Sequence, residues 1–266
     1  MLLALPEPYD FDLSTERFRR FGVDLANLWH DDALYRVVDG REVRIRAAPG
    51  GVDVEPLDDR TRTDVLKLLG AEFDLAAFYA WAANDDVLGP LTAKLAGLRP
   101  PLSPDPFEAL VTSITAQQVS LFSAFAIRTR MIERLGVPVG HAYAFPSRER
   151  LARTSEADLL AVGFSRRKAE YVIGLAQSDL DVDALAELDD DEVRARITAL
   201  RGLGPWTAEW FLARHLARPR AWPVGDIALQ KAVRVLYGVD VYEMGPRLDP
   251  FQNLSAHYLL TGARTP

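Results

Sequence analysis

Alternation of apolar and polar positions near the start of the chain predicts a small antiparallel sheet. In REVRIRAAP (residues 41–49) apolar residues alternate with charged ones, the period of two that a strand with one buried face requires. The apolar run ALYRVV (33–38) precedes it and ends at Asp39-Gly40, a strong two-residue hairpin signal. The turn residues Pro49-Gly50-Gly51 then lead into VDVEP (52–56), which alternates again. The sequence to about position 58 therefore indicates strands.

From about residue 60 onward the apolar spacing becomes helical almost to the end. The clearest helix start is Asp105, a good N-cap residue, followed by Pro106 at the first helical position and Glu108 three residues after the cap. The pattern predicts one helix from there to a C-cap at Gly136. Further helices are predicted at 147–153, 155–162, 165–178, 189–199, 205–217 and 226–236, joined by short loops.

These elements predict an α+β fold. We expect a β-rich N-terminal domain with trailing helices at residues 1–95, and a mainly helical region that divides into two lobes around a cleft at 96–266. The chain has 266 residues, which suffices for one large or two modest domains.

Composition narrows the function classes. The chain has no cysteine, which excludes disulfides, a thiolate nucleophile, a Cys-type zinc site and an iron–sulfur cluster. Its net charge of −7 argues against a protein that coats nucleic acid through bulk electrostatics, although a local surface can still bind it. No apolar run is long enough to cross a bilayer, and the N-terminus has no basic segment of the kind that begins a signal peptide. We expect a cytoplasmic protein that does not associate with membranes.

The segment 198–231 carries the chemistry. A helix ends near Leu200, and Gly202-Leu203-Gly204 forms a tight turn before a helix that begins at Pro205. The glycines let a bulky group approach the backbone, and the N–H groups at the start of the helix carry positive partial charge. Such a site suits a phosphate without any basic side chain. The alternative is that the glycines only make a sharp turn; a dinucleotide fingerprint is excluded because no strand precedes them.

Asp226 lies 22 residues after Gly204, in Trp222-Pro223-Val224-Gly225-Asp226, directly before a predicted helix. An aspartate at this point is ordinarily an N-cap. Capping and catalysis are compatible, so a capping role does not exclude a second role for Asp226.

The glycine turn and the spaced aspartate resemble the helix-hairpin-helix (HhH-GPD) DNA glycosylase superfamily, and within it the bacterial 3-methyladenine DNA glycosylase II (AlkA-type) branch. The resemblance rests on LRGLGPWTA (200–208) and on Gly225-Asp226 before a helix. Two further blocks are similar to the family: ITAQQVS (114–120), the helix–loop that fills the gap left by a flipped base, and GFSRRKA (163–169), which packs beside the hairpin. Together these cover residues 100–260, and the N-terminal sheet fits the family's extra β domain.

The resemblance implies a role for each matching residue. Asp226 would be the catalytic carboxylate in base excision repair of DNA damage by N-glycosidic bond hydrolysis. Gly202, Gly204 and Thr207 would hold a DNA phosphate, and Gln118 would be the residue inserted into the duplex. The backbone carbonyls of Thr198, Leu200 and Leu203 would coordinate a monovalent cation such as Na⁺ or K⁺, with no other cofactor. The partner would be double-stranded DNA that contains damaged bases, bound by a monomer.

Substrate choice is the least determined part of the resemblance. Trp206 and Trp210 share a helix face, and both are candidates for the base pocket, although core packing is an equal alternative for Trp210. An aromatic wall suits a cationic methylated purine such as 3-methyladenine or 7-methylguanine. The family's further pocket tryptophan is replaced by Leu260. An oxidised-guanine (8-oxoguanine) glycosylase of the same fold and a noncatalytic DNA-binding module are the alternatives.

Lysine placement bears on whether the strand is also cut. Bifunctional relatives carry a lysine nucleophile two residues after the second glycine, where this chain has Trp206, so the resemblance implies a monofunctional enzyme. Lys231 is predicted to project about 140° away from Asp226 on its helix. Arg166, Arg167 and Lys168 are interpreted as a solvated helix start.

Overall fold

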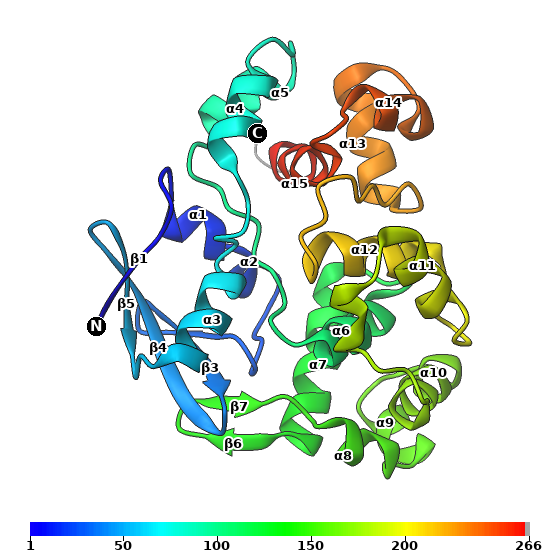
Figure 1. Ribbon diagram of the computed structural model, residues 1–266. Helices are drawn as coiled ribbons and strands as arrows, with labels where there is room; N and C mark the ends of the chain where they lie inside the picture. Colours follow the sequence, from blue (N-terminus) through cyan, green and yellow to red (C-terminus); the bar gives the residue numbers. More distant parts are fainter. Residues whose placement is uncertain (264–266) are drawn as a thin grey trace.

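A five-stranded antiparallel sheet forms the N-terminal part of the structure, a computed structural model that describes residues 1–263 (Figure 1). Its strand order is β1-β5-β4-β3-β2. The three longest strands were predicted, and the two short edge strands were not. The strands are β1 (Leu2–Ala4), β2 (Leu28–His30), β3 (Ala33–Val38), β4 (Arg41–Ala48) and β5 (Gly51–Glu55).

The hairpin between β3 and β4 has the geometry that its sequence requires. Asp39 and Gly40 both have positive φ, +49° and +70°, and the flanking residues Val38 and Arg41 are paired. This backbone is the turn whose twist matches that of the adjoining strands. Val43 and Ile45 on β4 are fully buried, whereas Arg44 is partly exposed and Arg46 is exposed, so the predicted alternation is confirmed.

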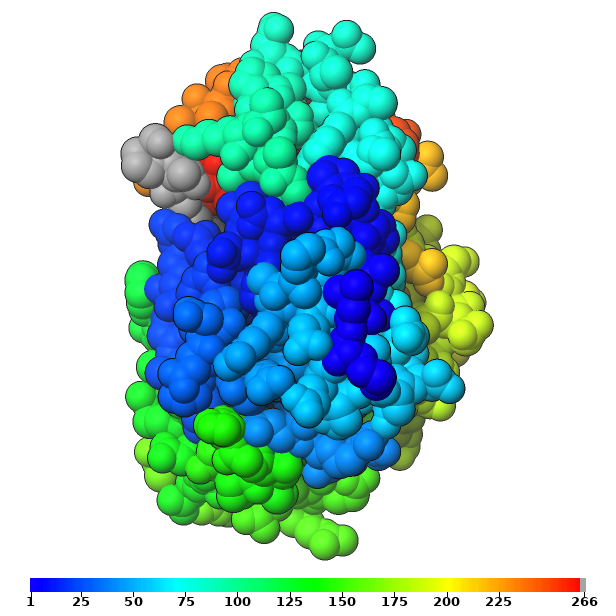
Figure 2. All heavy atoms as spheres, turned by 90° about the vertical axis from the view of Figure 1, so that its left-hand side faces the viewer, coloured from blue at the N-terminus to red at the C-terminus, as the bar shows by residue number. Residues whose placement is uncertain are grey.

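Helices interrupt the first 58 residues, where only strands were expected. Two short helices, α1 (Phe11–Thr15) and α2 (Arg17–Arg20), lie between β1 and β2. The Asp10 side chain caps α1 by accepting the N–H of Leu13, and Phe11 and Phe18 enter the apolar core of the sheet. These residues were missed because two short helical turns give too few positions for a period to emerge. Figure 2 shows this N-terminal surface, with the sheet region below the cyan helices and above the green hairpin.

The helical region forms two lobes that face each other (Figure 1). In one lobe α6 packs on α7, α10 and α12, and α11 packs on α12. In the other lobe α5 and α13 pack against α15. Among residues 1–263, no helix is both long enough and apolar enough to cross a bilayer. The helices are α3 (Asp59–Leu68), α4 (Leu75–Ala82), α5 (Leu88–Lys94), α6 (Pro106–Ala116), α7 (Leu121–Leu135), α8 (Arg148–Ala152), α9 (Glu156–Ala161), α10 (Arg166–Gln177), α11 (Asp190–Thr198), α12 (Pro205–Arg214), α13 (Ile227–Tyr237), α14 (Val241–Arg247) and α15 (Gln252–Gly262), with a 3₁₀ turn, η1 (Ala184–Glu187).

The single helix predicted from Asp105 to Gly136 is wrong, because the chain breaks between α6 and α7. Gln118 has a left-handed backbone with φ +53°, which no helix accommodates. Ser120 then caps α7 by accepting the N–H of Ser123. The apolar pattern continues in phase across the break, which is why periodicity alone did not reveal it. The loop expected from the family resemblance at 114–120 lies here.

A second difference lies after α7, where a hairpin replaces expected helix or loop. Strands β6 (Val137–Val139) and β7 (Ala142–Ala144) pair with each other and pack beside β3.

The apolar cores divide the chain earlier than the expected boundary at 95. Leu69 belongs to the core of the sheet, whereas Phe73 and the following helices α4 and α5 belong to the helical core.

A buried ionic cluster joins the sheet to the helices. Arg36 on β3 donates to Glu108 on α6 at 2.7 Å, and Arg128 on α7 donates to the other oxygen of Glu108 at 2.6 Å. Arg128 also pairs with Asp24 at 3.2 Å, and all four side chains are at most 8% exposed. Burial opposes ionisation, but the two guanidiniums outweigh it and lower the pKa of Glu108 to about 2. The side chain of Glu108 therefore bonds to arginines from the sheet and from α7. The spacing of Glu108 from Asp105 suggests a capping box, but of its two bonds only the one from the Glu108 N–H to Asp105 forms.

Candidate active site

A cleft of about 1480 Å³ runs between the two lobes, and its wall contains every site residue expected from the sequence. The loop between α6 and α7 forms one side, and the start of α13 with Leu260 of α15 forms the other. The cleft extends to the buried ionic cluster at the sheet. The expected residues that line it are Thr198, Leu200, Gly202, Leu203, Gly204, Trp206, Thr207, Trp210, Asp226 and Gln118.

Asp226 is held by four hydrogen-bond donors. One carboxylate oxygen, Oδ1, accepts the backbone N–H groups of Ala228 and Leu229, both at 3.0 Å, and so caps α13. The other oxygen, Oδ2, accepts the indole N–H of Trp206 at 3.2 Å and that of Trp210 at 3.0 Å. The capping interpretation is confirmed, and it leaves the carboxylate partly exposed in the cleft. Hydrogen bonds to both carboxylate oxygens therefore fix the orientation of the Asp226 side chain.

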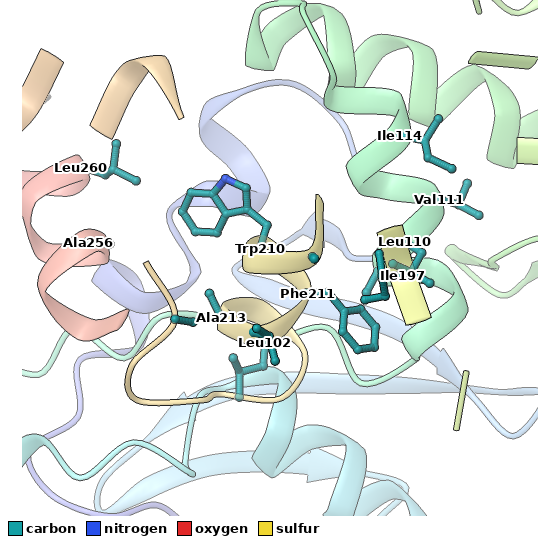
Figure 3. Close-up of a cluster of buried hydrophobic side chains, with 14 of the residues drawn as sticks. Leu102, Leu110, Val111, Ile114, Ile197, Trp210, Phe211, Ala213, Ala256 and Leu260 are labelled. Atoms are coloured by element: carbon teal, nitrogen blue, oxygen red, sulfur yellow. The ribbon is translucent and has the colours of Figure 1, made fainter. Parts of the chain in front are cut away.

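Trp206 and Trp210 differ in what remains of their surfaces. Trp206 is partly exposed, whereas Trp210 is 2% exposed and belongs to the helical core. Figure 3 shows Trp210 and Phe211 leaving α12 in different directions, Phe211 toward Ile197 and Leu110 and Trp210 away from them. Both tryptophans donate to Asp226 and line the cleft, and Trp210 is also packed in the helical core, as the core-packing alternative for it expects.

The two glycines of the hairpin serve different purposes. Gly202 has φ +91°, and a side chain there would lie 2.2 Å from the ring of Tyr171, so only glycine fits. Gly204 has φ −95°, and nothing lies within 4 Å of the position that a Cβ would occupy. Gly204 is the N-cap residue of α12 and offers no side chain to its first N–H groups. The open space therefore lies at the positive end of a helix.

Thr207 turns inward, and a residue that sequence reasoning overlooked holds it. The Thr207 side chain is 1% exposed, and its backbone N–H bonds to the carbonyl of Gly204 at 2.9 Å. The Gln117 amide donates to the carbonyl of Gly202 at 2.8 Å and to the hydroxyl of Thr207 at 3.3 Å. Gln117 thus ties the loop after α6 to the hairpin. It lies in the block that resembles the family, but its 85-residue separation from Gly202 hides this contact in the sequence.

Gln118 forms the exposed tip of the same loop. Its positive φ directs the chain outward, and Val119 beside it is 40% exposed. Four residues further on, Phe122 at the start of α7 is 64% exposed. The tip therefore presents a polar side chain, as expected, but apolar side chains flank it.

The lysines are placed partly as expected. Lys168 is half-buried and not a surface residue: its amine donates to the carbonyl of Thr115 at 2.8 Å, and burial lowers its pKa. The reason is that α10 begins beside the end of α6, where unpaired carbonyls attract a cation. Arg166 and Arg167 are exposed as predicted. Lys231 is exposed on α13 and lines the same cleft as Asp226.

The backbone oxygens expected to bind a cation lie at the hairpin. The carbonyl of Leu200 accepts the N–H of Leu203 at 3.1 Å. Within residues 1–263, no hydrogen bond reaches the carbonyl of Thr198 or that of Leu203. Oxygen donors without charge suit a hard cation of low charge, so this donor set fits a monovalent ion.

Comparison with known proteins supplies the classification. The family model described as HhH-GPD superfamily base excision DNA repair protein matches residues 111–243, which is half of the chain. The chain belongs to this superfamily. It is 32% identical over 196 residues, 69% of the chain, to DNA-3-methyladenine glycosylase of Bacillus subtilis, and 31% identical over 147 residues, 53% of the chain, to DNA-3-methyladenine glycosylase 2 of Escherichia coli. It spans 65% and 50% of the lengths of these two relatives.

Solved structures of DNA glycosylases support the whole fold. A 3-methyladenine DNA-glycosylase from Archaeoglobus fulgidus matches with a TM-score of 0.88 and 25% identity, over 100% of this chain and 99% of that one. The Clostridium acetobutylicum 8-oxoguanine glycosylase/lyase in complex with DNA matches with a TM-score of 0.81 at 17% identity, over 96% and 92% of the two chains. At that identity the second likeness concerns the fold alone. The α+β architecture with a two-lobed helical region is confirmed.

Proposed function

We propose that this protein is a monofunctional DNA glycosylase that hydrolyses the N-glycosidic bond of alkylated purines in double-stranded DNA, as an early step of base excision repair. The observation that carries the proposal is the carboxylate of Asp226, held in an interlobe cleft by two indole N–H groups next to a glycine hairpin. The names of the relatives described above support the same reaction and lesion class.

The chemistry follows from one fixed negative charge. Breaking the bond between sugar and base develops positive charge on the sugar, and a preorganised carboxylate stabilises that charge more in the transition state than in the ground state. Four donors hold Asp226, so little reorganisation is required during the reaction. A purine alkylated on a ring nitrogen is already cationic and leaves readily. The base must leave the duplex to reach the cleft.

DNA would be held at two points. The open N-terminus of α12 at Gly204 would receive a backbone phosphate, with a monovalent cation on the carbonyls of Thr198, Leu200 and Leu203 reducing the charge there. Gln118, on its exposed tip, would enter the space that the flipped base leaves. Backbone N–H groups form the phosphate site, which accounts for DNA binding by a chain of net charge −7.

The decisive experiment measures release of free base from methylated duplex DNA. We expect release of 3-methyladenine and 7-methylguanine by the wild-type protein and little release by Asp226→Asn. The amide keeps an acceptor for α13 but places an NH₂ against two indole N–H groups, so some stability is also lost. Asp240→Asn is the matched control, because Asp240 caps α14 and is not part of the cleft wall.

Three outcomes decide between the candidates. Excision by Asp226→Asn at nearly the wild-type rate would assign the chemistry to another group. Release from an 8-oxoguanine duplex without release from methylated DNA would establish the oxidised-guanine alternative. Binding of damaged DNA with no release of any base, by folded wild-type protein, would favour a noncatalytic module.

A further inference from the structure

The segment 222–226, which ends at the candidate catalytic carboxylate, is bonded to both lobes at its first residue. The backbone N–H of Trp222 donates to Oε2 of Glu209 on α12 at 2.9 Å. The indole N–H of Trp222 donates to the carbonyl of Val241 on α14 at 3.0 Å, and its ring packs on Gly245, where a Cβ would lie 2.8 Å from it. Because α12 belongs to one lobe and α14 packs on α13 in the other, Trp222 joins the two (Figure 1).

Hydrogen bonds inside this segment carry the position of Trp222 to Asp226. The N–H of Val224 donates to the Trp222 carbonyl at 2.8 Å, and the N–H of Asp226 donates to the Pro223 carbonyl at 2.9 Å. The ring of Pro223 also fixes its own φ. Gln230 on α13 donates its amide to the carbonyl of Val224 at 2.7 Å. The five residues therefore form a stiff unit, so a displacement of Trp222 also moves Asp226.

Glu209 holds the start of the segment from the same helix whose indoles hold its end. It lies between Trp206 and Trp210 in the sequence, and its side chain is 15% exposed. Its Oε1 accepts the Nε–H of Arg194 on α11 at 2.6 Å, so both carboxylate oxygens are bonded and the side chain is held in one orientation. Glu209 is not among the described residues that form the cleft wall. Any effect of Glu209 on excision therefore acts through Asp226 and not through contact with a base.

We propose that Glu209 is a positioning residue for the reaction: it keeps the carboxylate of Asp226, which belongs to one lobe, in register with the indoles and the hairpin of the other. This inference rests on the proposed glycosylase function. Without the Glu209 acceptor, the backbone N–H of Trp222 loses its partner on α12, and Trp222 remains bonded to α14 alone. A displacement of about 1 Å at a catalytic group can slow a reaction about a hundredfold. The loss falls on the chemical step, because the glycine hairpin that would hold the DNA phosphate is unchanged.

The test separates the chemical step from DNA binding in three variants. Glu209→Met keeps the length of the side chain without an acceptor, and Glu209→Gln keeps one acceptor oxygen for the N–H of Trp222. Arg194→Met removes the ion pair but leaves the bond to Trp222. Excision of 7-methylguanine from a duplex is measured in single turnovers at saturating protein, where a loss of folded fraction changes the amplitude and not the rate constant. The Kd for a duplex that contains a tetrahydrofuran abasic site is measured by fluorescence anisotropy.

We expect the rate constant to fall roughly ten- to a hundredfold in Glu209→Met, with the Kd for the abasic duplex within about twofold of wild type. Glu209→Gln and Arg194→Met should keep the rate constant within about threefold of wild type.

An unchanged rate constant in Glu209→Met would overturn the inference and leave the proposed function intact. A fall of the same size in Glu209→Gln or in Arg194→Met would mean that the charge or the contact with α11, and not the acceptor for Trp222, sets the rate, which also overturns it. Affinity lost in parallel with the rate in Glu209→Met would assign the effect to a general loss of structure, again against the inference. A wild-type protein that releases no base would refute the glycosylase proposal itself.

Discussion

The buried cluster around Glu108 allows a quantitative prediction for Glu108→Gln. The carboxylate accepts from Arg36 at 2.7 Å and from Arg128 at 2.6 Å, and Asp24 is the second carboxylate of the cluster. Glutamine is nearly isosteric, but its NH₂ group points a donor at a guanidinium. Two buried positive charges then share one negative charge.

The magnitude follows from two independent arguments. Removing one partner of a buried ion pair costs about 3–5 kcal/mol, because the remaining charge stays desolvated. The pKa of Glu108, lowered from 4.5 to about 2, corresponds to roughly 3 kcal/mol of stabilisation of the folded state. We therefore expect Glu108→Gln to reduce the free energy of unfolding by about 3 kcal/mol.

Urea unfolding followed by circular dichroism measures this loss, as a midpoint lowered by about 1–2 M. The control is Glu55→Gln, since Glu55 pairs with Arg44 at 2.6 Å with both side chains substantially exposed. It should cost less than about 1 kcal/mol. A loss in Glu108→Gln no larger than in Glu55→Gln would mean that desolvation cancels the attraction in the cluster.

The pH dependence gives the same prediction a second test. The folded-state pKa of Glu108 lies below its unfolded value, so its stabilisation is fully present above about pH 4.5 and is lost as the pH falls toward 2. The stability difference between wild type and Glu108→Gln should therefore shrink over this interval. A difference that stays constant between pH 5 and pH 3 would refute the assigned origin.

Three further predictions concern the cleft. Gly204→Ala should fold as the wild type does but bind duplex DNA roughly tenfold more weakly in fluorescence anisotropy, whereas Gly202→Ala should lose more than about 2 kcal/mol of stability because of its φ of +91° and its contact with a ring. Unchanged affinity in Gly204→Ala would mean that the hairpin is only a turn. Trp210→Phe removes one of the two indole donors to Asp226, and single-turnover excision should slow about tenfold; an unchanged rate would show that this hydrogen bond is dispensable. Borohydride should trap no covalent adduct with an abasic duplex, and an adduct that disappears in Lys231→Ala would establish lyase activity by the lysine in the cleft wall.

Local signals predicted the parts of the fold that depend on adjacent residues. The Asp39-Gly40 turn and the strands on either side of it need only neighbouring positions, and they agree with the structure. The break at Gln118 did not emerge because the apolar period continues through it. The role of Glu108 was assigned to its own helix, since a partner on β3 72 residues away leaves no local pattern.

The residues of the candidate site also separate into those with a local sequence signal and those whose contacts are long-range. The hairpin glycines and the N-cap at Asp226 stand out because turn and helix-start chemistry are local, whereas only the family resemblance implies a catalytic role for Asp226. The contacts of Gln117 are long-range, and a glutamine in a polar block carries no signal of its own.

The amide of Gln117 has a consequence for where along a strand the enzyme can work. It joins the loop that carries Gln118 to the hairpin at Gly202 and Thr207, so the proposed inserting residue and the proposed phosphate site are linked at a defined separation. Under the proposed function, that separation would correspond to a constant number of nucleotides, counted in one direction because a DNA strand has polarity. Lesions at equal distances from the two ends of a duplex would then be unequal substrates.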